Sequence, residues 1–378
     1  MSLIVDEHRQ YLSDPVRVGA FGRAIAAVVR PGDVVVDLGC GTGILGMLAC
    51  RAGARRIYAI EPTGMIEIAR ALANANGLGD RFVFLQQHST EAVLPEQADV
   101  LVSDFIGRMG FDNGLFEIYA DAGRFMKPGA RRIPASLAMS ATAVEDAEQF
   151  EHVRFWDRPC AGLDMSAARV WARNTGYPRL LAPQALLSDE TVSIRCRSDA
   201  REALVRLRGD VVVGRAGTMH GLGAWFDADL GGGVTLSNAP LAAERLNRRN
   251  VFFPLDQPVD VERGDRVSIH VRIRPAEIIV NWDVEIHSAR GRRVEQHSTL
   301  DGMLISREEL RANAPESTPR LTPRGLARRS ILALCDGQRS LADIEREVFR
   351  RHPELFASSG EAQAFVAEVV TRYAEPDA

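Results

Sequence analysis

A glycine-rich turn that follows an acidic residue is the part of the sequence best suited to binding a ligand. The segment from Val35 to Gly43 reads Val-Val-Asp-Leu-Gly-Cys-Gly-Thr-Gly, a β-branched run that leads through glycines into a helix-like stretch. Gly39 and Gly41 let the backbone approach a ligand without a Cβ clash, and Gly43 allows close packing at the start of the helix. Glu61 follows about twenty residues later, where a carboxylate accepts hydrogen bonds from ribose hydroxyls. These residues predict a site for a nucleotide-type cofactor.

The spacing of the glycines separates two classes of cofactor. Dinucleotide oxidoreductases carry Gly-x-Gly-x-x-Gly, which places a pyrophosphate at a helix N-terminus. This turn is Gly-x-Gly-x-Gly, and Asp37 precedes it. A carboxylate at that position suits the ammonium group of a methionine moiety. The pattern therefore favours S-adenosylmethionine over NAD, and it favours either cofactor over a turn with only a structural role.

The strands and helices that must position these residues are expected in two patterns. Apolar runs at residues 34–36, 56–60, 82–85 and 99–103 alternate with helix-like segments. Such alternation is typical of βαβ units on a parallel sheet. After Ile133-Pro134 the pattern changes, and runs at residues 192–194, 210–213 and 266–271 predict antiparallel strands of a sandwich or barrel.

We therefore predict an α/β fold with three parts. A Rossmann-like parallel-sheet domain takes residues 1–134, and a β-barrel domain takes residues 135–305. The proline and polar residues at 313–320 read as a linker. Apolar residues at helical spacing then predict three short helices in a winged-helix-like unit at 321–378, with Ser340 as the N-cap of the second helix.

The composition of the chain limits which binding partners and which cellular compartment are expected. Hydrophobic residues make up 46% and charged residues 25% of the 378 residues, the ordinary balance of a globular protein. A net charge of -4 supplies no basic field, so nucleic acid is not an expected partner. The five cysteines form no Cys-x-x-Cys, which argues against a zinc site. Without a long apolar run or a basic targeting segment, we expect a cytoplasmic protein that does not bind a membrane.

From about Tyr11 to about Ser288 the sequence resembles the protein arginine methyltransferase family. The blocks that carry the resemblance are Asp37–Leu45, Ala52–Ile57 and Ile133-Pro134. It implies a Rossmann-like domain, a β-barrel and a head-to-tail homodimer, because Gly162–Ser166 resembles the dimerisation arm of that family. The resemblance also assigns the cofactor contacts: Asp37, Gly39, Gly41 and Glu61 for methionine and ribose, and Ser89 and Thr90 for adenine.

The loop expected to hold the acceptor, residues 104–113 (the acceptor loop), differs from the matching loop of that family. Its members hold a guanidinium between two glutamates, and the matching positions here are Asp104 and Asn113. Asp112 substitutes for the second glutamate only if the loop shifts, and Arg108 adds a positive charge. The doubly anionic clamp is at most half present. We expect Asp104 to orient the acceptor and take up its proton, with Asn113 or Asp112 fixing the geometry.

A second substrate-side signature is also different. The family's Thr-His-Trp motif is missing, and the corresponding segment reads Arg245-Leu-Asn-Arg-Arg-Asn250. Because the cofactor signatures are kept, the sequence predicts methyl transfer to a side chain of a peptide or protein with an altered acceptor. The sequence leaves a second interpretation open, namely that the protein is a degenerate arginine methyltransferase. The alternative from another class is a non-catalytic peptide-binding or regulatory protein that retains the fold.

The C-terminal segment Leu326–Tyr373 resembles the precursor-peptide recognition domain of pyrroloquinoline quinone biosynthesis. Such domains bind a leader peptide by adding a strand to a small sheet. Residues 307–320, which precede the segment, do not read as strands. The sequence therefore leaves two roles for this segment open: recognition of a ribosomally made precursor peptide, or a structural cap.

Overall fold

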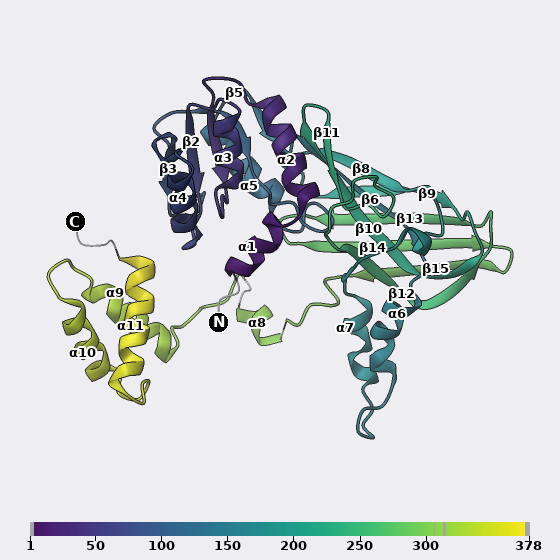
Figure 1. Cartoon of the computed structure of the whole chain (residues 1–378). Coiled ribbons are helices and arrows are strands. Elements are labelled where there is room, and N and C mark those ends of the chain that lie inside the picture. Colours follow the sequence, from purple (N-terminus) through teal and green to yellow (C-terminus); the bar gives the residue numbers. More distant parts are fainter. Residues whose placement is uncertain (1–3, 306, 313–314, 375–378) are drawn as a thin grey trace. The chain divides into compact units, whose positions relative to one another are not determined.

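The computed structural model describes residues 4–305, 307–312 and 315–374. The chain forms two compact units, residues 1–303 and 304–378. In Figure 1 the first unit begins with a parallel sheet and its helices, in purple and blue, and continues into antiparallel sheets in teal and green. Each unit has its own hydrophobic core.

Five parallel strands in the order β3-β2-β1-β4-β5 form the first sheet. The strands are β1 (Val34–Leu38), β2 (Arg56–Ile60), β3 (Phe82–Leu85), β4 (Ala98–Val102) and β5 (Met126–Ile133). The helices of this part are α1 (Ile4–Leu12), α2 (Pro15–Val28), α3 (Ile44–Arg51), α4 (Met65–Ala75) and α5 (Leu115–Ala122). The predicted Rossmann-like sheet is confirmed. Its strand order reverses between β1 and β4, the place where open α/β sheets bind ligands.

Burial explains why β1 reads as an apolar run. All five of its residues are buried, as expected for a central parallel strand. Asp37 interrupts the run, so a carboxylate lies inside the core of the domain.

Short 3-10 helices lie at Gly79–Arg81, Gly123–Phe125, Arg154–Asp157, Ser166–Ala168 and Pro183–Ala185.

Two antiparallel sheets follow in the region where the sequence predicts a β-barrel, so the antiparallel strands are confirmed and their closure into a barrel stays a prediction. The first has the order β7-β12-β10-β6-β8 with β11 on β10, and the second has the order β15-β14-β13-β9. Their strands are β6 (Ser136–Val144), β7 (Tyr177–Arg179), β8 (Val192–Arg197), β9 (Val205–Val212), β10 (Gly217–Gly231), β11 (Val234–Ser237), β12 (Asn250–Val261), β13 (Arg266–Arg274), β14 (Ile279–Ser288) and β15 (Gly291–Ser298). Burial alternates along β13, so one face of the second sheet packs on the core, where Trp282 is fully buried.

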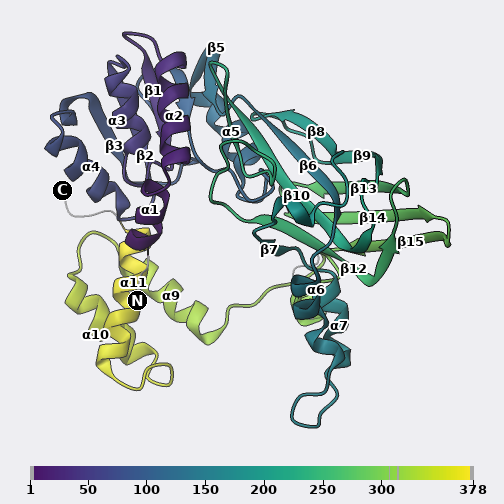
Figure 2. The same cartoon turned by 45° about the vertical axis from the view of Figure 1, so that its right-hand side comes forward.

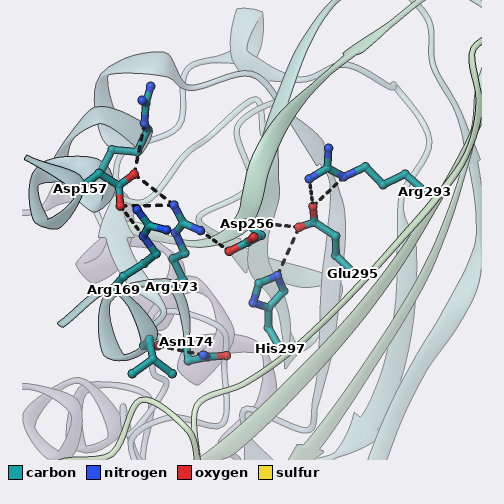
Figure 3. A network of polar contacts seen from close by, with 10 residues as sticks. Asp157, Arg169, Arg173, Asn174, Asp256, Arg293, Glu295 and His297 are labelled. Carbon is teal, nitrogen blue, oxygen red and sulfur yellow. Dashed lines mark hydrogen bonds and ion pairs between the residues drawn. The ribbon is translucent and has the colours of Figure 1, made fainter. Parts of the chain in front are cut away.

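A helical arm connects β6 to β7 and projects from the antiparallel sheets, as Figure 2 shows. Its α-helices are α6 (Ala147–Val153) and α7 (Arg169–Arg173). Charged contacts hold its base. The buried Arg173 guanidinium lies 3.1 Å from the Asp157 carboxylate of the arm and also pairs with Asp256 of β12 (Figure 3). The Asp256 N–H in turn donates a hydrogen bond of 2.5 Å to Glu295 of β15. The arm is therefore anchored to both antiparallel sheets.

The second unit is helical. It holds α8 (Arg307–Ala312), α9 (Pro323–Leu334), α10 (Leu341–Arg351) and α11 (Ser359–Tyr373). The three helices predicted after residue 321 are confirmed, and the Ser340 side chain caps α10 by accepting the Asp343 N–H. Among the described residues of this unit there is no strand, so the winged-helix arrangement stays a prediction. In the described parts of the whole chain, no helix combines the length and apolar character needed to cross a membrane.

Candidate active site

The carboxyl ends of β1, β2 and β4 carry three acidic residues that the sequence singled out. Asp37 is the penultimate residue of β1, Glu61 directly follows β2, and Asp104 follows β4. Leu38 and Ile60 are partners in the sheet register, so β1 and β2 end side by side. Because parallel strands end at one edge of their sheet, these carboxylates lie around the same crevice.

Asp37 is a fully buried carboxylate with a hydrogen bond to only one of its two oxygens. Its Oδ2 accepts the Gly46 N–H at 2.8 Å. Its Oδ1 has no hydrogen-bond partner within residues 4–305, 307–312 and 315–374. The pKa of Asp37 is raised to about 7, mainly by burial and to a lesser degree by the nearby Glu61 charge, while the Gly46 hydrogen bond acts to lower it. A cationic group at the turn is the partner that this carboxylate lacks.

The glycine turn has no room for side chains at two positions. Gly39, Gly41 and Gly43 all have left-handed backbone conformations, with φ of 66°, 51° and 73°. A Cβ on Gly39 would lie 2.4 Å from the Phe105 ring, and one on Gly41 would lie 2.3 Å from the His8 ring of α1. The turn therefore keeps its shape only with glycine at these positions.

Glu61 is held against this turn by its own hydrogen bonds. One carboxylate oxygen accepts the Gly41 N–H at 3.2 Å, and the other accepts the N–H and the hydroxyl of Thr63 at 3.0 and 2.7 Å. An ionised carboxylate has about four acceptor sites, so one remains at the oxygen next to Gly41. A ribose hydroxyl is a donor of the right type for that site.

The residues expected near adenine lie in a turn after β3. The backbone carbonyl of Ser89 accepts a hydrogen bond from Arg124, and Thr90 is exposed. Their contacts with adenine stay a prediction. Together, a buried carboxylate with one unpartnered oxygen, a glycine turn and a fixed acceptor on Glu61 fit S-adenosylmethionine in charge and hydrogen-bonding type.

Asp104 is bound to an arginine that the sequence pattern did not single out. Its side chain is 9% exposed, and its Oδ2 forms an ion pair with Arg17 of α2. The other oxygen, Oδ1, is buried and has no hydrogen-bond partner in the part of the chain that the structure describes. A second guanidinium nitrogen, Nη2 of Arg248, lies 3.8 Å from Oδ1. The carboxylate therefore faces two arginines and keeps one oxygen free of hydrogen bonds.

Solved structures share this architecture. The Trypanosoma brucei PRMT1 enzyme-prozyme heterotetrameric complex with AdoHcy has a chain that matches with a TM-score of 0.69 and 18% identity, over 77% of this chain and 97% of that chain. Arabidopsis thaliana protein arginine methyltransferase 10 matches with a TM-score of 0.66 and 23% identity, over the same shares of the two chains. At these identities the likeness establishes the fold.

Family models and related proteins cover the same region. Residues 23–156 match the model of the ribosomal protein L11 methyltransferase (PrmA), and residues 135–288 match the arginine methyltransferase oligomerization subdomain. Protein arginine N-methyltransferase 6 of Xenopus tropicalis is 26% identical over 290 residues, which cover 72% of this chain and 85% of that protein. The histone-arginine methyltransferase CARMER of Anopheles gambiae is 27% identical over 323 residues, or 79% of this chain and 50% of that protein. The chain is an S-adenosylmethionine-dependent methyltransferase. Its resemblance to the protein arginine methyltransferases is confirmed, and its cofactor is S-adenosylmethionine.

The other two residues proposed for the acceptor loop of the methyltransferase have different surroundings from Asp104. The Asp112 carboxylate accepts the N–H groups of Met109 at 2.8 Å and Arg108 at 3.0 Å, so it stabilises the fold of the loop. Asn113 is exposed just before α5. Of the three residues, Asp104 alone is nearly buried and paired with charged side chains.

The antiparallel domain of the methyltransferase supports this loop through residues that sequence reasoning missed. Asn238 donates a hydrogen bond of 2.8 Å to the Arg108 carbonyl, and Arg248 donates to the Ile106 carbonyl. Nothing in the local spacing of Asn238 or Arg248 indicates these contacts, because each partner is more than a hundred residues away in the sequence. The acceptor loop is thus shaped by both domains.

Proposed function

We propose that the enzyme transfers a methyl group from S-adenosylmethionine to a side chain of a peptide or protein, and that this acceptor is less cationic than a guanidinium. The observation that carries the proposal is the charge around Asp104. One carboxylate there faces Arg17 and, at 3.8 Å, Arg248. A cationic acceptor would be a third positive group around a single negative one, which like-charge repulsion disfavours.

The reaction requires the protein to align the acceptor with the methyl group and to accept the proton of the acceptor. The sulfonium of the cofactor supplies an electrophilic methyl group, so the enzyme has to hold the acceptor in line with it and exclude water. Asp104 is suited to accept a hydrogen bond from the acceptor through Oδ1, because Arg17 already occupies Oδ2. An imidazole, amide or hydroxyl offers one donor without adding a full positive charge.

Replacing Asn113 by glutamate is expected to raise any weak activity on arginine peptides by about two- to fivefold, the effect of one exposed charge. The same change is expected to lower activity on a neutral acceptor. Methyl transfer to peptides that differ only in the central residue measures both. Asn113→Gln is the matched control, since it lengthens the side chain without adding charge. Efficient methylation of arginine peptides by the unchanged enzyme, with Asp104 and Asp112 both essential, would contradict the proposed acceptor class.

For the homodimer, we propose that the arm around Trp156 to Arg173 packs on the parallel-sheet domain of a second copy. The large apolar side chains Phe155, Leu163, Val170 and Trp171 are exposed along this segment. Exposed apolar surface of this kind marks protein contacts. The match of residues 135–288 to the oligomerization subdomain model supports the same assignment.

Light scattering at tens of micromolar protein is expected to give twice the mass of the chain. Leu163→Asp places a charge on an arm residue that is 68% exposed, so it is expected to shift the population to monomer without lowering the melting temperature. Val212→Asp, on β9, is the control and is expected to leave the mass unchanged. A monomeric wild-type protein under these conditions would count against the dimer.

For the C-terminal unit, we propose that it binds the leader of a ribosomally made precursor peptide that carries the acceptor. Support comes from its resemblance to precursor-peptide recognition domains and from the exposed leucines Leu321, Leu326, Leu332 and Leu341 on and beside its helices. Calorimetry with peptides encoded beside this protein tests the proposal. Binding that Leu332→Asp does not weaken would assign the unit to a structural role instead.

A further inference from the structure

We infer that Arg248 is the residue that selects against cationic acceptors, by acting as an internal guanidinium beside the free oxygen of Asp104. The inference rests on the proposed function and names a specificity-determining residue for it. Arg108, the positive residue within the acceptor loop, is exposed and has no contact with Asp104 among those that the described residues make. The charge that matters therefore comes from the antiparallel domain.

The position of Arg248 is fixed by its neighbours in the fold. It lies between β11 and β12, and its side chain is only 17% exposed. Its Nη1 donates to the carbonyl of Ile106 in the acceptor loop. The adjacent Asn247 N–H donates a hydrogen bond of 3.1 Å to Asp14, the residue that caps α2. The guanidinium is therefore held between the two domains and does not behave as a mobile surface charge.

The two arginines act on different oxygens of Asp104. Arg17 hydrogen bonds to Oδ2, whereas Nη2 of Arg248 lies 3.8 Å from Oδ1. That separation is beyond hydrogen-bond range, so Arg248 influences Oδ1 by charge and leaves its lone pairs available. An incoming N–H or O–H group can donate to Oδ1, but an incoming cation meets the Arg248 charge at close range.

The alternative role for Arg248 is structural, because its hydrogen bond to the Ile106 carbonyl connects the two domains. Arg248→Gln separates the two roles, because glutamine keeps an N–H donor for that carbonyl and loses the charge. Arg248→Lys keeps the charge with a different geometry. Arg249→Gln is the matched control, since Arg249 is the next residue, is exposed and carries the same charge.

The experiment measures binding of two peptides that differ only in a central arginine or citrulline, which have nearly the same shape and differ in charge. Calorimetry is carried out on the full chain loaded with S-adenosylhomocysteine. Wild type and Arg248→Lys are expected to bind the citrulline peptide more tightly. Arg248→Gln is expected to shift the ratio of the two dissociation constants toward arginine by about tenfold, and Arg249→Gln by less than about twofold.

An unchanged ratio in Arg248→Gln, or binding of neither peptide by that variant, would overturn the inference. So would a shift of equal size in Arg249→Gln. The melting temperature and the affinity for S-adenosylhomocysteine check that each variant is folded. A result that contradicts the proposed function itself is different: the wild-type enzyme would prefer the arginine peptide and methylate it efficiently.

Discussion

Asp104→Asn is expected to lower the rate of methyl transfer by roughly 10²- to 10⁴-fold, the range that positioned acid-base groups contribute. The change removes the negative charge next to Arg17 and Arg248 and leaves an amide, which is a poor proton acceptor. It leaves the glycine turn and Glu61 untouched. Affinity for S-adenosylmethionine is therefore expected to stay within about threefold of wild type, because the contacts proposed to hold the cofactor are unchanged.

Single-turnover kinetics and calorimetry measure the two quantities separately. Asp210→Asn is a matched control on β9, where a carboxylate of 51% exposure lies 3.9 Å from Arg266. The melting temperature is needed as well, because Arg17 loses its ion-pair partner. If Asp104→Asn kept a methyl-transfer rate within about fivefold of wild type, less than any positioned proton acceptor contributes, Asp104 would have no role in the transfer.

Glu61→Ala is expected to weaken binding of S-adenosylmethionine by about 1.5 to 3 kcal/mol, the effect of hydrogen bonds to a charged group. This corresponds to roughly a 10- to 150-fold increase in the dissociation constant. The carboxylate is expected to accept ribose hydroxyls, and it also holds the Gly41 N–H at 3.2 Å. Its loss therefore removes both a ligand contact and a support of the turn.

Calorimetry on Glu61→Gln separates these contributions, since glutamine keeps an acceptor and loses the charge. An intermediate loss of affinity is expected. Glu67→Ala, in the first turn of α4, removes an exposed carboxylate and is expected to leave the affinity unchanged. Unchanged binding in Glu61→Ala would remove Glu61 from the cofactor site.

Four of the five strands of the parallel sheet could be predicted from the sequence, whereas β5, which contains Pro128 and Gly129, was not predicted. The run at 56–60 is β2 as observed, and the run at 82–85 is β3. Most residues of β1, β2 and β4 are buried, so their sequences are mainly apolar and stand out against the helices. The helix α2 was not predicted, although Asp14 and Pro15 form a typical helix start.

The antiparallel region could be predicted as strands but not as a topology. Alternating burial along β13 leaves its mark on the sequence, and the run at 266–271 lies within that strand. Which strands share a sheet depends on contacts across long stretches of chain, as in the pairing of β6 with β10. Local patterns carry no information on such pairing, so a barrel and two sheets were not distinguishable.

The proposed cofactor half of the site was determined by the sequence itself, because most of its parts are neighbours along the chain. A strand, a turn with φ values that favour glycine and a helix place Asp37 and Gly39 by local geometry alone, and Glu61 directly follows the adjacent strand. The acceptor half was decided by tertiary structure. Asp104 and Arg17 are 87 residues apart, and Arg248 reaches the acceptor loop from the other domain. An electrostatic interaction depends on the distance in space and not on the separation in the sequence. Only the packed fold therefore determines which cations surround the Asp104 carboxylate.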